Sequence, residues 1–185
     1  MRISLCAMTA LMALLATGGT AAQSVDSKRI VAPRDVVALE EGVWDAIITS
    51  PPRTARGKPT TTSGVQINEL RSGGMWMLNR MSANGGAYEG TGIWGYDPRT
   101  GRYSGAWVDN SSSRIRADDG SWDADTNTMT WIAEIERPDG QKLRMRATST
   151  FAGNTRTYRS FALTDGAAIP LSTVVFTRRP HSAAR

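Results

Sequence analysis

The sequence predicts an all-β protein: a single antiparallel up-and-down β-barrel of about ten strands, preceded by one short helix. The first observation is a series of short strand-like segments at regular spacing, with turn residues between them and almost nothing helical after Gly42. The second is the stretch 88–109, in which glycines alternate with tryptophans and tyrosines. Glycine inside a strand marks a bend or a close backbone approach, and neighbouring aromatic rings fill the space that it leaves. This combination is typical of a strongly curved, closed sheet.

The first 22 residues have the pattern of a secretory signal peptide. Arg2 precedes an apolar run over 3–16, and small residues follow up to Ala22, after which we expect cleavage. The run is too short to span a bilayer comfortably and no long apolar stretch follows, which disfavours an uncleaved membrane anchor. We therefore expect a periplasmic or secreted protein. Cleavage removes Cys6, the one cysteine, and with it any disulfide, thiol nucleophile or thiolate metal site.

The chain after residue 22 divides into a polar lead with a short helix over 23–41, a barrel over 42–180 and a flexible tail over 181–185. Pro33 starts the helix and Gly42 ends it, which is the usual asymmetry at helix ends. Strands are predicted at 43–49, 60–70, 75–82, twice within 88–109 around a turn at 97–101, and at 114–117, 128–137, 142–150, 155–163 and 171–178. Further turns are predicted at 84–86, 118–120, 125–127 and 138–140.

Alternating polarity within three strands predicts which side chains face the barrel interior. The inward sets are Met75, Met77 and Met81 with Asn79 between them, then Met129, Trp131, Ala133 and Ile135, and then Leu143, Met145 and Ala147. The basic residues that alternate with the last set, and so face outward, are Lys142, Arg144 and Arg146. A barrel of about eight or more strands either fills its interior with side chains or holds one small ligand. Both interpretations remain open from the sequence.

Two short motifs resemble those of the calycins, the superfamily of lipocalins and fatty-acid-binding proteins. Gly42 and Trp44 form a Gly-x-Trp motif at the first strand, and the last strand ends in Arg178 and Arg179. The resemblance implies that the Trp44 indole packs beneath an arginine of the last strand, Arg178 or Arg179, and closes the barrel. Such a contact is a cation–π interaction.

A longer resemblance covers nearly all of 36–179. The stretch 90–109, GTGIWGYDPRTGRYSGAWVD, together with GSWD at 120–123 and FTRR at 176–179, resembles the bacterial domain-of-unknown-function family 1579 within the same superfamily. The resemblance implies a calycin-like barrel. It implies no known activity and transfers no catalytic residue, and the lipocalin T-D-Y turn is absent from this chain.

The leading functional hypothesis is an exported barrel that binds a small, mostly apolar molecule in a cavity lined by aromatic and methionine side chains. The residues expected to form its walls are Trp94, Trp107, Trp131, Met77 and Met145. The candidates that orient a polar end of the ligand are Asn79, Arg80 and Tyr96.

Two alternatives belong to other functional classes. The first is a cofactor-independent isomerase, cyclase or lyase acting on a hydrophobic metabolite, which requires an inward carboxylate or tyrosine. Its candidate residues are Glu89, Asp97, Asp109, Arg80 and Tyr158. The second is a structural or interaction protein of the cell envelope that meets anionic material through basic side chains. These side chains are Arg53, Arg56 and Lys58 in one loop, and Lys142, Arg144 and Arg146 on one strand.

We expect no metal or cofactor, no nucleic-acid partner and no stable membrane insertion. Asp123, Asp125 and Asn127 have the spacing of a calcium loop, but Thr128 stands where that loop needs glycine. The one histidine, His181, follows the last strand and is poorly placed for a catalytic triad or a haem ligand. The net charge is +5, but the arginines are scattered and export argues against nucleic acid.

Overall fold

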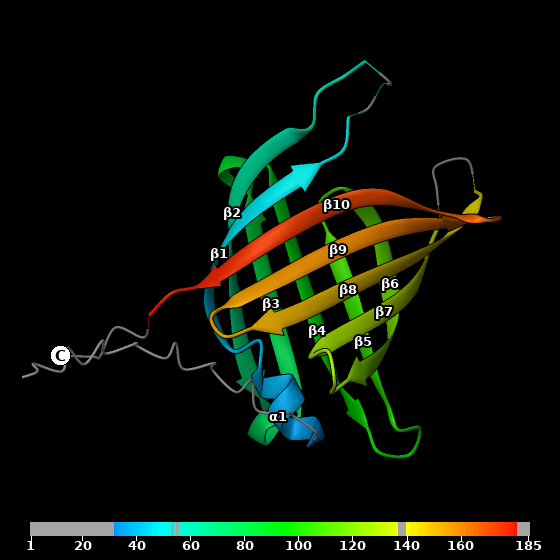
Figure 1. The fold of residues 1–185 in the computed structure, drawn as a ribbon. Helices are drawn as coiled ribbons and strands as arrows, with labels where there is room; N and C mark the ends of the chain where they lie inside the picture. The colour runs from blue at the N-terminus through cyan, green and yellow to red at the C-terminus, as the bar shows by residue number, and fades with distance from the viewer. Residues whose placement is uncertain (1–31, 53, 55, 137–139, 181–185) are drawn as a thin grey trace, which may run out of the picture.

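The computed structural model of the chain describes residues 32–52, 54, 56–136 and 140–180 (Figure 1). Several predicted features lie outside the described residues. They are the signal peptide at 1–22 with Cys6, most of the polar lead, the tail at 181–185 with His181, and Arg53. So does most of the turn predicted at 138–140.

Ten strands in the described part of the chain form one closed antiparallel barrel, and one short helix, α1 (Pro33–Ala38), precedes them. The strands are β1 (Gly42–Ser50), β2 (Thr60–Arg71), β3 (Trp76–Ala83), β4 (Tyr88–Asp97), β5 (Arg102–Asp109), β6 (Ser112–Asp123), β7 (Thr128–Glu136), β8 (Lys142–Ala152), β9 (Thr155–Thr164) and β10 (Ala167–Arg178). Every strand pairs with its neighbours in sequence, and β1 also pairs with β10. The predicted fold class is confirmed.

Helix α1 covers one end of the barrel, as Figure 1 shows below the strands. Its Val36 and Val37 are each 1% exposed, and they pack in one cluster with Met77 of β3 and Trp94 of β4. Pro33 occupies its first turn, where a missing backbone N–H costs nothing. The helix therefore forms a plug at this end of the barrel.

At the opposite end, the closing strands separate. The β1–β10 pairing runs from Trp44 and Arg178 up to Thr49 and Thr173, and it stops there. Beyond that point β1 continues only with β2, and β10 only with β9, so that the two hairpins diverge (Figure 1). The pairing of β10 with β9 has a register shift between Pro170 and Ser172. Strand β10 begins at Ala167, four residues before the predicted start at residue 171.

Two sequence predictions about local structure are wrong. The turn predicted at 118–120 does not exist, because β6 runs without interruption from Ser112 to Asp123. Gly120 lies beneath the Trp131 ring, and a Cβ there would lie 2.5 Å from that ring. The glycine thus permits a close approach in place of a turn. Met75 does not face inward: it precedes β3 in a helical backbone conformation and is 55% exposed.

Candidate functional site

The interior of the barrel contains a cavity of about 780 Å³. It extends from Glu40, beside the helix, to Ser50 and Ser111 at the opposite end. Trp94, Trp131 and other inward-facing side chains of the strands form its walls. The barrel interior is therefore only partly filled by side chains.

Five of the eight predicted ligand-site residues meet in this cavity. Trp94, Trp107, Trp131, Met145 and Asn79 all line it. They come from five different strands and are brought together by the closure of the sheet.

The other three predicted residues lie elsewhere. Met77 is completely buried, but it packs under α1 and not against the cavity. Tyr96 packs against Tyr103 at 5.1 Å between ring centroids, in the cluster that contains Val36 and Val37 of α1, and does not line the cavity. Arg80 lies on the outer surface, where it pairs with Glu69 at 3.2 Å. Adjacent residues of a strand face opposite sides, so an inward residue 79 requires an outward residue 80, and the prediction for Arg80 is wrong.

Glycines in the strands allow the indole rings to lie flat against the barrel wall. A Cβ on Gly92 of β4 would lie 2.5 Å from the Trp107 ring of β5, and a Cβ on Gly90 would lie 2.3 Å from the same ring. Gly120 does the same for Trp131 across the β6–β7 pair. Since real side chains cannot approach so closely, these positions require glycine, and the rings form walls without filling the cavity.

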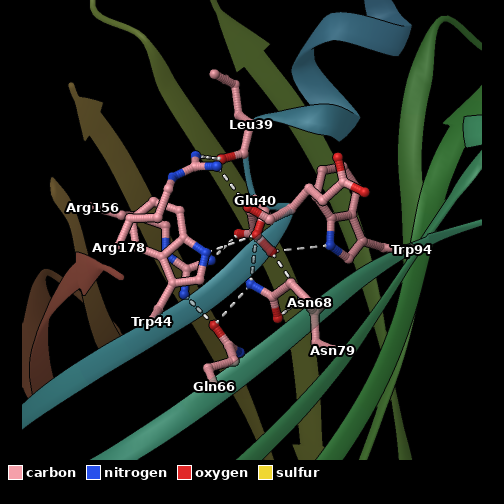
Figure 2. A network of polar contacts seen from close by, with 10 residues as sticks. Leu39, Glu40, Trp44, Gln66, Asn68, Asn79, Trp94, Arg156 and Arg178 are labelled. Atoms are coloured by element: carbon pink, nitrogen blue, oxygen red, sulfur yellow. Dashed lines mark hydrogen bonds and ion pairs between the residues drawn. The ribbon is translucent and has the colours of Figure 1, made fainter. Parts of the chain in front are cut away.

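A buried polar network forms the floor of the cavity around Glu40 (Figure 2), which is 7% exposed. Its carboxylate pairs with Arg156 Nη1 at 2.5 Å and accepts hydrogen bonds from Asn79 Nδ2 at 3.0 Å and Trp94 Nε1 at 3.3 Å. Its backbone carbonyl accepts a hydrogen bond from Trp44 Nε1 at 2.8 Å. A buried charge needs such partners, and Glu40 has them all from the protein.

The same floor contains the contact that closes the barrel. Trp44 is completely buried, and the Arg178 guanidinium lies 4.3 Å from the centre of its ring (Figure 2). Arg178 also donates hydrogen bonds to the carbonyls of Leu39 and Glu41, both at 2.6 Å. The Arg156 guanidinium also lies near this ring, at 5.3 Å from its centre. Of the two arginines that the resemblance offers for this contact, the structure places Arg178 there.

Further along the wall, Tyr88, Trp107 and Asp109 form a second polar group. Trp107 Nε1 donates to Asp109 Oδ2 at 3.1 Å and lies 3.2 Å from the Tyr88 hydroxyl, which in turn donates to Asp109 at 3.3 Å. Burial foremost, and then the Asp109 charge, raises the pKa of Tyr88 to about 12. Burial alone would raise the pKa of Asp109, but hydrogen bonds from Ser111, Trp107 and Tyr88 hold it below the usual value.

A third polar group lies on β6. Arg116 and Asp118 form a two-pronged ion pair, with Nε to Oδ1 at 2.8 Å and Nη2 to Oδ2 at 3.0 Å. Both line the cavity, together with Tyr158 of β9. Burial is the main influence on Tyr158 and raises its pKa, so its phenol stays protonated at neutral pH.

Sequence reasoning missed four charged residues of this cavity: Glu40, Arg156, Arg116 and Asp118. On β9 the inward positions are Arg156, Tyr158, Ser160 and Ala162, whereas Phe161 and Leu163 face outward, opposite to what hydrophobicity suggests. The register with β10 would have identified them, because Arg156 pairs with the buried Phe176. On β6 the erroneous turn concealed the alternation of residues 116, 118 and 120.

The remaining candidates for chemistry have local structural roles. Asp97 accepts the backbone N–H of Arg99 at 2.9 Å and caps the β4–β5 turn, and Glu89 is exposed. Asp123 accepts bonds from the Asp125 backbone and the Thr126 hydroxyl in the β6–β7 turn. Within the described ranges no group of three histidine, cysteine or carboxylate residues is arranged to hold a metal. Asp109 and Tyr158 alone of these candidates face the cavity.

The fold and the site define a calycin-like barrel with a cavity that is both aromatic and polar. The sequence model of the family described as "Protein of unknown function (DUF1579)" matches residues 31–178, and the chain belongs to this family. A comparison with curated proteins found no match. Among the described residues, no helix has the length and apolar character needed to cross a membrane.

Solved structures share the fold at low sequence identity. Rv2717c from M. tuberculosis has 12% identity and a TM-score of 0.60, over 82% of this chain and 100% of that chain. The S-type phycobiliprotein lyase CPES from Guillardia theta has 12% identity and a TM-score of 0.56, over 82% of this chain and 95% of that one. At this level of identity the likeness extends to the fold alone.

Proposed function

We propose that the protein binds one small amphipathic molecule inside the barrel. The observation that carries the proposal is the cavity of about 780 Å³ between indole walls. Ligand sites typically measure about 300–1,000 Å³ and combine apolar walls with a few polar groups. Trp94, Trp131 and Met145 would contact the apolar body, and the polar groups of β4 to β6 would contact the polar end.

A substitution that fills the cavity tests this proposal. Ala147 of β8 lines the cavity and is 1% exposed, whereas the next residue, Thr148, faces the outside of the same strand. Binding of Nile red, an uncharged amphipathic dye, is measured by its fluorescence. We expect Ala147→Phe to weaken binding by about tenfold or more and the matched Thr148→Phe to leave it unchanged, because only the first occupies ligand volume. Equal binding by both folded variants and the wild type contradicts the proposal.

One observation favours an enzyme as the second candidate. A cofactor-independent isomerase, cyclase or lyase requires an inward carboxylate or tyrosine, and Asp109, Tyr88 and Tyr158 all line the cavity. A structural neighbour is named a phycobiliprotein lyase, so barrels of this architecture accommodate enzymes, but a fold does not define an activity. Recovery of bound ligands by mass spectrometry separates the two functions: a binding protein returns them unchanged, and an enzyme returns an isomer or a fragment.

We also propose that the protein is exported. The proposal is supported by the charged start, apolar run and small residues within 1–22. Expression of the full chain followed by cell fractionation and N-terminal sequencing tests it. We expect a mature protein that begins at Gln23 in the envelope or medium, and an intact Met1 in the cytoplasm is the contrary result.

An envelope-interaction role through the basic strand β8 receives less support. Lys142 Nζ lies 3.2 Å from Glu134, and the Arg146 guanidinium lies over Phe161 at 5.3 Å. These side chains are partly engaged by neighbours on the barrel. Equal binding of anionic vesicles by a variant with all six basic residues neutralised, Arg53, Arg56, Lys58, Lys142, Arg144 and Arg146, would remove this role.

A further inference from the structure

Four of the five charged side chains in the cavity wall are paired with each other. The charged side chains that line the cavity in the described part of the chain are Glu40, Asp109, Asp118, Arg116 and Arg156. Arg156 pairs with Glu40 at 2.5 Å, and Arg116 pairs with Asp118 through two hydrogen bonds of 2.8 and 3.0 Å. Neither arginine therefore needs a ligand carboxylate as its counter-ion.

The remaining carboxylate, Asp109, is satisfied as well. Its Oδ2 accepts Trp107 Nε1 at 3.1 Å and the Tyr88 hydroxyl at 3.3 Å, and its Oδ1 accepts the Ser111 backbone N–H at 3.0 Å. A ligand ammonium group would have to compete with these donors. A charge taken from water into such a cavity is stabilised only if an accessible partner is present. Both arginines are already paired, and three hydrogen-bond donors already occupy the oxygens of Asp109, the one carboxylate of the described lining without a counter-ion.

The wall nevertheless offers hydrogen-bond donors to a neutral acceptor. A guanidinium has five N–H groups, and Asp118 occupies only the Nε and Nη2 sides of Arg116. The Arg116 side chain is 26% exposed and lines the cavity, so its remaining N–H groups are accessible from it. Tyr158 also lines the cavity, and its phenol O–H is a hydrogen-bond donor at neutral pH. These groups donate and suit an acceptor oxygen.

We infer that the cavity selects an uncharged amphipathic molecule whose carbonyl oxygen accepts hydrogen bonds from Arg116, over a carboxylate or an amine of the same size. This inference rests on the proposed function and specifies its ligand class. The apolar part of the ligand lies against Trp94 and Trp131, and the carbonyl lies toward β6.

Three ligands of equal chain length test the selection in the wild-type protein. Methyl laurate, laurate and laurylamine displace Nile red from the cavity at concentrations below their own aggregation. We expect methyl laurate to bind at least about tenfold more tightly than either charged ligand, because the arginines are already paired and the Asp109 oxygens are already hydrogen-bonded, which leaves a ligand charge without an accessible partner. We also expect the infrared carbonyl stretch of the bound ester to shift to lower frequency than in hexane.

A charge-altering variant tests the part played by Arg116. Asp118→Asn leaves Arg116 without its counter-ion, and we expect the ratio of laurate to methyl laurate affinity to rise by about tenfold or more. The matched control is Asp119→Asn on the outer face of the same strand, where Asp119 pairs with Arg102 at 2.6 Å, and its ratio should stay at the wild-type value.

The outcomes separate this inference from the proposed function. Tighter binding of laurate than of methyl laurate by the wild type overturns the ligand class alone. An unchanged ratio of laurate to methyl laurate affinity in Asp118→Asn also overturns it, provided that circular dichroism shows the variant to be folded. A wild-type protein that binds neither Nile red nor any of the three ligands overturns the proposed function and this inference with it.

Discussion

Replacing Trp44 with alanine tests how far the stability of the barrel depends on its closure. The indole is 0% exposed, and two guanidinium groups lie near its ring, those of Arg178 at 4.3 Å and Arg156 at 5.3 Å from its centre. Truncation of a buried aromatic costs about 3–5 kcal/mol through lost transfer energy and the cavity left behind. The lost Nε1 bond to Glu40 adds about 1 kcal/mol, so we expect a value near the top of this range.

Two further substitutions divide this free energy into its parts. Trp44→Phe keeps much of the ring but removes the N–H donor, and we expect a loss of about 1–2 kcal/mol. Arg178→Met keeps the apolar stem but removes the cation–π contact and the bonds to Leu39 and Glu41, so we expect a loss of about 2–3 kcal/mol. Because of these two hydrogen bonds, the expected loss of stability is larger than that of a cation–π contact alone.

The assay is urea unfolding followed by far-ultraviolet circular dichroism, which does not depend on the tryptophan signal. With an m-value of about 1–3 kcal/mol per molar urea, Trp44→Ala lowers the midpoint by about 2 M. The matched control is Trp76→Ala, because Trp76 is 37% exposed on β3 and should cost about 1 kcal/mol or less. A loss below about 2 kcal/mol for Trp44→Ala, or equal losses for both tryptophans, refutes the reasoning.

Three other predictions concern the interior. Gly120→Ala should cost about 1–3 kcal/mol and change the near-ultraviolet spectrum, because its Cβ would lie 2.5 Å from Trp131; an unchanged spectrum contradicts this. Glu40→Gln and Arg156→Met should each cost about 3–5 kcal/mol, with the double variant costing clearly less than their sum, and additive losses would deny the coupling. Burial, with a smaller contribution from the neighbouring phenol, raises the pKa of Tyr103 to about 12, so the unfolded chain loses this proton first and stability falls between about pH 10 and 12. Tyr103→Phe should make that fall in the urea midpoint smaller, and an identical fall contradicts the assignment.

The barrel could be predicted from the sequence because its signals are local. Turn residues recur at regular spacing, and glycine beside tryptophan has few uses other than the close packing seen at Gly92 and Trp107. The closure contact is not local, but its two motifs stand at the ends of the barrel. Closure necessarily brings β1 beside β10, so Trp44 and Arg178 could be paired without knowledge of the strands between them.

The charged half of the cavity could not be predicted in the same way. Polarity does not indicate which side chains face inward where a barrel buries ion pairs. Arg156 faces inward and is 3% exposed, whereas its strand neighbours Phe161 and Leu163 face outward. Phe176 of β10 is buried, and Arg156 of β9 lies directly opposite it in the strand pairing. Residues opposite each other in paired strands face the same side of the sheet, so this pairing places Arg156 in the interior whatever its polarity.

Two of the polar groups of the cavity, the floor around Glu40 and the Arg116–Asp118 pair, differ in the expected consequences of mutation. Near α1, the donors of Asn79, Trp94 and Trp44 all converge on Glu40, and the guanidinium of Arg156 lies 3.9 Å from the Phe176 ring. These groups stabilise the closed end, so their loss should affect folding before it affects the choice of ligand. Arg116 of β6 instead keeps N–H groups accessible from the cavity. Changes at this wall should alter ligand selection while costing less stability than changes at the floor.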